Sequence, residues 1–271
     1  MTTLLFGVSG LPLGNGQKFH YASGISYLKQ FGLDALELLF VRSVNVSDRN
    51  SGLIVQRKTE HDFHLSAHGS YYINLNADTP DKQRQSLRRI TDGAAALRLV
   101  GGRSLVFHPG FYLGKSPAAA CDTIRENLRK LPQQGMDYRL ETTGKGTQCG
   151  TVAELVALCR EVPSCKPCID FAHIHARGNG ALRTYADFAN ILDTLREGLG
   201  RGALDDMHIH MGGIAYGPKG EKHHLPLLES DFNYTACLQA LRDYAVRGCV
   251  ICEGPRLEYD AIILKNTYHR L

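Results

Sequence analysis

The chain has 271 residues, of which 43% are hydrophobic and 21% are charged. This composition excludes a disordered chain and is sufficient for one large α/β domain or two small ones. The formal net charge of +4 is compatible with a polyanionic partner, but it is a weak indication because the sequence has no concentrated basic tail.

The N-terminal sequence and the cysteines predict a cytoplasmic protein with reduced thiols. Residues 1–6 form a short apolar run without the basic region or the small-residue cleavage site of a signal peptide. No apolar stretch is long enough to span a bilayer, so we expect no membrane contact. The two Cys-x-x-Cys pairs, Cys165–Cys168 and Cys249–Cys252, are too far apart for a zinc ribbon. We therefore expect the 8 cysteines as free thiols.

Short apolar runs alternate with longer amphipathic runs along the whole chain. Eight of the short runs are predicted as strands, because they are rich in Val, Ile, Leu, Phe or Cys and too short for helices. They are Leu4–Ser9, Leu36–Arg42, His64–His68, Ser104–His108, Tyr138–Thr142, Pro167–Phe171, Met207–Met211 and Cys249–Glu253.

The runs between these strands have apolar positions at helical spacing. Thr79-Pro80-Asp81 is a typical helix start, and Gly248 lies where a helix is expected to end. The Gly-rich, polar segment Gly212–Glu221 is interpreted as a long loop after the seventh strand. The predicted helices are Gly52–His61, Asp81–Leu99, Ala118–Leu131, Val152–Val162, Tyr185–Leu199, Asp231–Val246 and Leu257–His269.

Eight strands that alternate with helices in a chain of this length predict a closed (β/α)₈ TIM barrel. We expect residues 1–271 to form one domain of this class, since the sequence has no linker, low-complexity tract or internal repeat. The main alternative is an open doubly wound sheet. It is disfavoured by the count of eight strands and by the lack of a Gly-x-Gly-x-x-Gly motif after the first strand. A Walker-type loop is also lacking, so we expect no nucleotide cofactor.

Polar residues stand at the ends of six consecutive predicted strands, where a (β/α)₈ barrel builds its active site. One such residue is more often structural than functional, but so many carboxylates in one pocket would repel one another without bound cations. Imidazoles and carboxylates without cysteine favour Zn²⁺, Mn²⁺ or Fe²⁺. Nine ligands are too many for one ion, and with a bridging carboxylate they would suit three. The candidate ligands are His68, His108, Glu141, Asp170, His173, His208, Glu221, His223 and Glu253, with His210 as the alternative to His208.

The motifs around these residues resemble those of the endonuclease IV family of abasic-site DNA repair nucleases. They occur in the family's order and at compatible distances, from about the third strand to the end of the chain. They are His68-Gly69-Ser70-Tyr71-Tyr72-Ile73-Asn74-Leu75, His108-Pro109-Gly110, Glu141-Thr142-Thr143-Gly144-Lys145-Gly146, Ile169-Asp170-Phe171-Ala172-His173, the strand with His208, Glu221-Lys222-His223 and Glu253-Gly254-Pro255.

This resemblance implies a trinuclear zinc centre, with Mn or Fe possible at some sites. His208 is preferred to His210 because its distance to Glu221-x-His223 matches the family, although both side chains point to the same strand face. The implied ligand sets are His68, His108 and Glu141 for the first metal, Glu141, Asp170, His208 and Glu253 for the second, and His173, Glu221 and His223 for the third.

The resemblance also implies an activity, which is hydrolysis of the phosphodiester 5′ to abasic sites in double-stranded DNA, as part of base excision repair. The products would be a 3′-hydroxyl and a 5′-deoxyribose phosphate. Glu141 would be catalytic, since it would hold two metals together and accept a proton from the nucleophile. Tyr71 matches the family's inserted tyrosine, and Arg42, Lys145 and Lys222 are the other candidates for DNA contact. We expect the protein to be a monomer.

Some features depart from the family, and two other functions stay open. Glu221 replaces the usual Asp, the first strand ends without a nearby His, and His210 stands where the family often has Asn-Asp. One alternative is a sugar isomerase or epimerase of the related xylose isomerase-like barrels, which would use one or two metals and would not need the third ligand set. The other is a non-catalytic DNA-binding protein on a decayed nuclease scaffold, although no ligand position is obviously lost.

Overall fold

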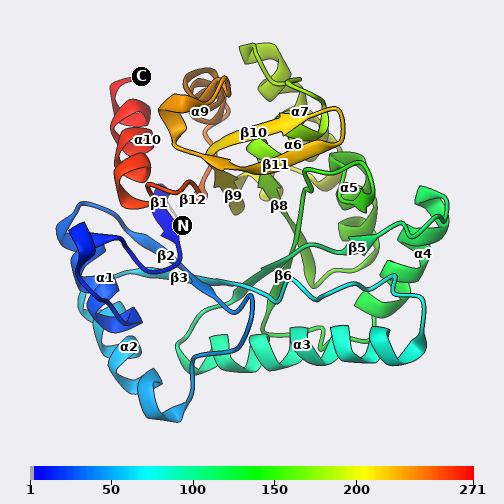
Figure 1. Cartoon of the computed structure of the whole chain (residues 1–271), viewed down its shortest axis with the longest axis horizontal. Coiled ribbons are helices and arrows are strands. Elements are labelled where there is room, and N and C mark those ends of the chain that lie inside the picture. Colours follow the sequence, from blue (N-terminus) through cyan, green and yellow to red (C-terminus); the bar gives the residue numbers. More distant parts are fainter. Residues whose placement is uncertain (1–2) are drawn as a thin grey trace.

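The structure, a computed structural model, describes residues 3–271 (Figure 1). Within these residues, eight parallel strands close into a barrel, so the predicted TIM barrel is confirmed. All eight predicted strands are present, with ends that differ by a few residues. In the order in which they pair around the barrel, they are β1 (Leu4–Ser9), β12 (Gly248–Cys252), β9 (Met207–Met211), β8 (Cys165–Asp170), β6 (Asp137–Glu141), β4 (Ser104–Phe107), β3 (His64–His68) and β2 (Ala35–Leu39).

Helices connect the strands and surround the barrel (Figure 1). The predicted helix starts are explained by side-chain caps, such as the Thr79 hydroxyl that accepts from the backbone N–H of Lys82. The helices are α1 (Tyr21–Gln30), α2 (Asp48–Glu60), α3 (Pro80–Leu99), α4 (Pro117–Leu128), α5 (Val152–Glu161), α6 (Phe171–Arg177), α7 (Tyr185–Leu199), α8 (Gly202–Asp205), α9 (Tyr234–Asp243) and α10 (Glu258–Arg270).

The sequence prediction missed three of these helices, which are α1, α6 and the four-residue α8. Helix α1 is short and contains Gly24, which weakens a helical pattern, and it begins at a capping box of His20 and Ser23. Helix α6 starts directly after β8, because the Asp170 side chain accepts a hydrogen bond of 2.8 Å from the backbone N–H of His173. This cap brings His173 back over the end of β8.

The segment expected as a loop after the seventh strand is instead an antiparallel hairpin of β10 (Gly213–Gly217) and β11 (Gly220–Leu225). Its tip rests on the loop after β6, since the backbone N–H of Glu221 donates to the Gly144 carbonyl at 2.9 Å. Gly220 has φ +89°, and a Cβ there would lie 2.1 Å from the same carbonyl oxygen. A second small sheet pairs β5 (Gly110–Phe111) with β7 (Gln148–Cys149).

The interior of the barrel is more polar than is usual for this fold, in which branched apolar residues dominate. The side chains of Glu37, Ser66, Arg139 and His208 are all buried. The apolar core lies largely between strands and helices, where residues such as Ile90 of α3 are fully buried. The described part of the chain contains no helix with the length and hydrophobicity required to cross a membrane.

Candidate metal centre

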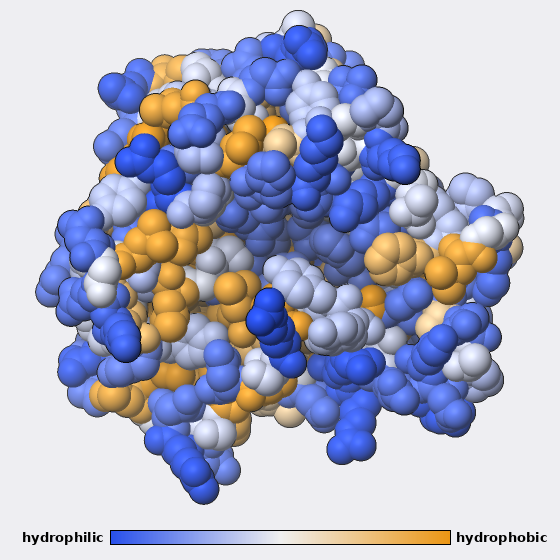
Figure 2. Space-filling view, in the orientation of Figure 1, coloured by the Kyte–Doolittle hydropathy of each residue, from blue (hydrophilic) through white to orange (hydrophobic). Residues whose placement is uncertain are grey.

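The polar strand ends meet at the C-terminal mouth of the barrel, as the sequence predicts. In the orientation of Figure 1, the space-filling view shows a hollow near the centre of the molecule with hydrophilic residues around it (Figure 2). His68, Glu141 and Asp170 are the last residues of β3, β6 and β8. His108 directly follows β4 and Glu253 directly follows β12. Parallel strands therefore deliver side chains from five positions of the barrel to one place.

Glu141 is fully buried and forms the middle of the cluster. Its Oε2 lies 3.1 Å from His68 Nε2 and 3.0 Å from His108 Nε2. Its Oε1 lies 3.1 Å from His210 Nδ1 and 3.3 Å from His173 Nδ1. Both carboxylate oxygens thus face imidazoles on opposite sides, which is the arrangement required of a carboxylate that bridges two cations.

A second group of donors lies beside Oε1 of Glu141. His210 Nδ1 is 3.4 Å from Glu253 Oε2, and Asp170 Oδ2 is 3.2 Å from His173 Nδ1. Asp170 Oδ2 is buried without a hydrogen-bond partner among residues 3–271. Burial is the main reason why the pKa of Asp170 is raised.

A third group of donors surrounds the outer nitrogen of His173. Its Nδ1 lies 3.0 Å from the carbonyl oxygen of Thr142, so Nδ1–H can donate there and leave the lone pair of Nε2 free. Glu221 Oε2 lies 3.7 Å from this Nε2. His224 stacks at a tilt with its ring centroid 5.7 Å from that of His173, and its Nε2 is 3.8 Å from Glu253 Oε2.

Two of the nine expected ligands lie away from this cluster, and we revise them. His208 is two residues deeper in the barrel, where its Nε2 donates to Glu37 Oε2 at 2.8 Å, whereas His210 contacts Glu141 and Glu253. His223 is exposed, whereas its neighbour His224 is directed to the centre. The reason is a register shift in the hairpin, where the step from Ala215 to Tyr216 corresponds to two residues of β11.

Glu37 of β2 is a member of the site that sequence reasoning missed. It is fully buried, and its Oε1 lies 3.1 Å from His210 Nε2. Burial would raise the pKa of Glu37, but His210 and His208 lie against it and hold the pKa well below its usual range. The only signal in the sequence was an acidic residue inside the otherwise apolar run Ala35–Leu39.

The geometry of His68 and Glu141 indicates that this group of side chains suits divalent cations. His68 Nδ1–H donates to the Gly69 carbonyl at 2.8 Å, so the lone pair of His68 Nε2 is directed at the carboxylate of Glu141. Two electron-rich atoms 3.1 Å apart need a proton or a metal ion between them. Burial lowers the pKa of His68, but Glu141 more than offsets this and raises the pKa to about 9. The donors within 4.8 Å of one another include His68, His108 and Glu141, and separately Asp170, His173 and His224.

The four residues expected to contact DNA are all exposed on the same side of the barrel. Arg42 follows the end of β2, Lys145 follows β6, and Lys222 is on β11. Tyr71 is 65% exposed, and its ring centroid lies 5.7 Å from that of His68. The expected contacts of these residues with DNA stay a prediction.

The sequence matches the family described as xylose isomerase-like TIM barrel over residues 25–265. The chain belongs to this family. An uncharacterized protein of Methanocaldococcus jannaschii is 40% identical over 99% of this chain and 98% of its own length. A probable endonuclease 4 of Pediococcus pentosaceus is 25% identical, and that match covers 61% of this chain and 58% of the relative. The resemblance to the endonuclease IV family is therefore confirmed.

Solved structures of two kinds share the xylose isomerase-like fold with this chain to the same degree. Endonuclease IV from Thermus thermophilus has a TM-score of 0.74 and 20% identity, and the match covers 98% of this chain and all of that one. A D-tagatose 3-epimerase-like protein has a TM-score of 0.75 and 17% identity, with 98% of this chain and 96% of that chain covered. At these identities the likeness concerns the fold alone, and the choice between activities depends on the site.

Proposed function

We propose that this protein is a metal-dependent endodeoxyribonuclease that hydrolyses the phosphodiester 5′ to abasic sites, leaving a 3′-hydroxyl and a 5′-deoxyribose phosphate. The observation that carries the proposal is the position of Glu141 between two groups of imidazoles, with a third group around His173. The sequence similarity to endonuclease 4 proteins supports it.

The proposed ligands differ from the initial expectation at two positions. Bound divalent ions, zinc by our proposal, would acidify a water molecule and neutralise the phosphodiester. Five carboxylates, with Glu37 counted, against three divalent ions still leave a net positive centre, which suits an anionic substrate. The proposed sets are His68, His108 and Glu141, then Glu141, Asp170, His210 and Glu253, and finally His173, Glu221 and His224.

The positions of the other side chains suggest the role of each one in catalysis and DNA binding. Glu141 is the buried carboxylate that faces both inner groups, so in this proposal it would accept a proton from the attacking water. Exposed Tyr71 stands beside His68 and would enter the gap left by the missing base. Arg42, Lys145 and Lys222 would bind phosphates on either side of the lesion.

The test is incision of a duplex that carries a single abasic site, by protein reconstituted with zinc or manganese. We expect a nick on the 5′ side of the lesion whose 3′ end a DNA polymerase extends, and no nick in the same duplex without the lesion. An intact duplex with wild-type, metal-loaded protein would contradict the proposal. Binding of the abasic duplex without a nick would instead favour the non-catalytic DNA-binding reading.

The third group of donors distinguishes the proposed nuclease from the epimerase alternative. An epimerase would use one or two ions with a carboxylate pair and has no evident use for Glu221 and His224. Elemental analysis of the loaded protein is expected to find about three ions for each chain at this centre, beyond any ion bound elsewhere in the barrel, and one ion at this centre would favour the epimerase. The same preparation should be offered ketohexoses, on which we expect no turnover.

A further inference from the structure

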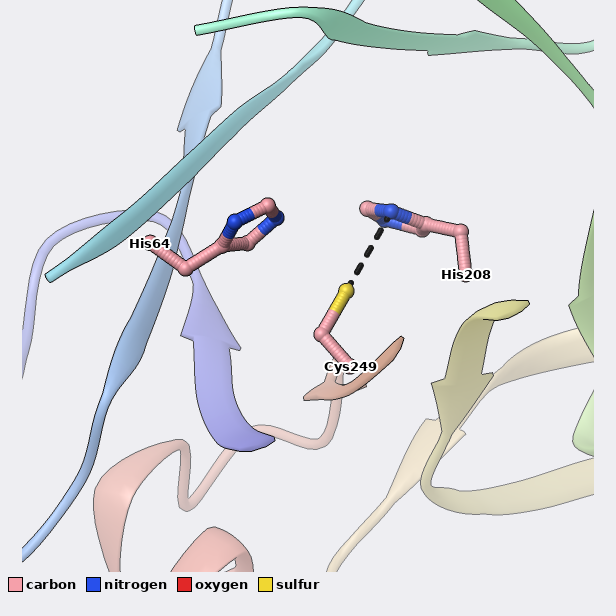
Figure 3. Close-up of side chains that lie close together, drawn as sticks. All are labelled: His64, His208 and Cys249. Carbon is pink, nitrogen blue, oxygen red and sulfur yellow. Dashed lines mark hydrogen bonds between the residues drawn. The ribbon is translucent and has the colours of Figure 1, made fainter. Parts of the chain in front are cut away.

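A second cluster of metal-binding side chains lies inside the barrel, toward the N-terminal ends of the strands (Figure 3). It consists of His64, the first residue of β3, His208 of β9 and Cys249 of β12. Strands β9 and β12 are neighbours, while β3 contributes from the other side of the barrel. Figure 3 shows the three side chains converging on one point. One donor atom of each lies within 4.8 Å of the other two.

The distance between Cys249 and His208 and the chemistry of all three donors suit one tetrahedral ion. Cys249 Sγ lies 3.3 Å from His208 Nδ1. Bond lengths of about 2.0–2.1 Å to nitrogen and about 2.3 Å to sulfur separate the ligands of tetrahedral zinc by roughly 3.3–3.7 Å. Two imidazoles and a thiolate are a donor set that zinc prefers, and the set differs from the oxygen-rich centre at the other end of the barrel.

His208 is already oriented for this role. Its Nε2–H donates to Glu37 Oε2 at 2.8 Å, which fixes the tautomer and leaves the Nδ1 lone pair directed toward Cys249. A carboxylate behind a histidine in this way is the usual support of a metal-binding imidazole. Without a metal, the Cys249 thiol can donate to this lone pair.

The ring of His64 is the part of the cluster that hydrogen bonding alone does not explain. Its Nε2 is buried and has no hydrogen-bond partner in the part of the chain that the structure describes. A buried imidazole nitrogen without a partner is costly.

The cluster borders a cavity that is open to solvent. His64 also lines an open cavity of about 600 Å³ at the N-terminal mouth of the barrel. Three carboxylates and three basic side chains line this cavity, and Lys166 pairs with both Asp137 and Asp206, so its charges are balanced. The guanidinium of nearby Arg139 is held by Asp206 at 3.0 Å and by the Ser104 hydroxyl at 3.2 Å, which offsets its repulsion of a cation.

We propose that His64 Nε2, His208 Nδ1 and the Cys249 thiolate bind one zinc ion, separately from the centre at the C-terminal mouth. Binding breaks the S–H bond of Cys249, releases that proton to solvent and forms a sulfur–zinc bond. The fourth position faces the cavity and takes a water molecule. The ion links β3 to β9 and β12 across the interior, and this inference does not depend on the proposed nuclease activity.

Cobalt substitution tests the site, because only a thiolate ligand gives tetrahedral Co²⁺ an intense charge-transfer band in the near ultraviolet. The folded full-length protein, freed of metal and titrated with Co²⁺, is expected to develop this band. The Cys249→Ser variant should lose the band and bind one ion fewer for each chain. Cys121→Ser and Cys168→Ser are the controls, and both should keep the band. Cys121 lies in a group that shares no residue with this site, whereas the group of Cys168 includes His208 but not Cys249.

The results of the cobalt titration distinguish a metal site from a cluster of side chains that is only hydrogen-bonded. Absence of the band in the wild-type protein, or its persistence in Cys249→Ser, would overturn the proposal. Circular dichroism checks that each variant folds. If Cys249→Ser fails to fold, His64→Ala replaces a less buried ligand, and cobalt affinity read from the same band should fall by at least about tenfold. An unchanged affinity in that variant would also overturn it.

Discussion

Glu141 is the single side chain on which the centre at the C-terminal mouth depends. Each of its oxygens faces two imidazoles, at distances from 3.0 to 3.3 Å. The variant Glu141→Gln keeps the size of the side chain and removes the charge that would balance two cations. We expect incision of abasic DNA to fall more than about 100-fold and at least one ion to be lost. Nuclease assays and elemental analysis of the folded variant measure both effects, and full activity would contradict the role given to Glu141.

His223 and His224 form a matched pair for testing the third group of donors. They are neighbours on β11 and therefore point to opposite sides of the strand. We expect His224→Ala to lose one ion and to cut abasic DNA more than about 100-fold more slowly, while His223→Ala keeps its ions and its rate. Equal losses in the two variants, or a loss in His223→Ala alone, would favour the original assignment from sequence.

Protonation of the centre predicts how metal uptake depends on pH. In the metal-free protein the pKa of His68 is about 9, so this imidazole is protonated at neutral pH and must lose its proton to bind an ion. Apparent metal affinity should therefore rise with pH until about 9. Because the pKa is above that of an unfolded chain, the proton stabilises the metal-free fold fully below about 6.5 and is lost as the pH rises through about 9. Calorimetric titration in two buffers of different ionisation enthalpy measures the protons released, and no release at neutral pH would count against this view.

The β10–β11 hairpin is the element that delivers Glu221 and His224 to the centre. Its tip is held where the Glu221 N–H meets the Gly144 carbonyl, a position at which Gly220 has no room for a Cβ. Gly220→Ala should therefore lift the tip, displace Glu221 and weaken the outermost ion by about tenfold or more. Melting temperature should change little, because the barrel does not depend on this contact. Gly146→Ala is the control in a neighbouring loop, since a Cβ there meets open space.

Across the whole molecule, bound ions would tie together strands that are far apart in the sequence. The proposed ligands extend from His68 of β3 to Glu253 after β12, so removal of the ions leaves a cluster of charges without its cations. Ions held at about a thousand times their dissociation constant stabilise a fold by about 4 kcal/mol. For a chain of this size we expect chelation to lower the melting temperature by roughly 10 °C, with recovery on adding zinc. An unchanged melting temperature would mean that the folded chain does not hold these ions.

The sequence by itself determined the barrel and the chemistry of its mouth. Alternation of apolar and amphipathic runs was enough to place all eight strands, since each period reflects local burial. Residue types at the strand ends predicted which donors gather there, because parallel strands of a closed barrel finish at one mouth. Seven of these donors, from His68 to Glu253, lie together as expected.

The tertiary structure decided which of several equivalent side chains take part. His208 and His210 share one strand face, and only closure of the barrel sets how deep each lies. As a result, His208 contacts Glu37 and Cys249, whereas His210 contacts Glu141. The register shift that exchanges His223 for His224 arises from pairing within a hairpin that the Gly-rich sequence did not indicate. Depth and register depend on contacts between residues far apart in the chain, and no local pattern encodes them.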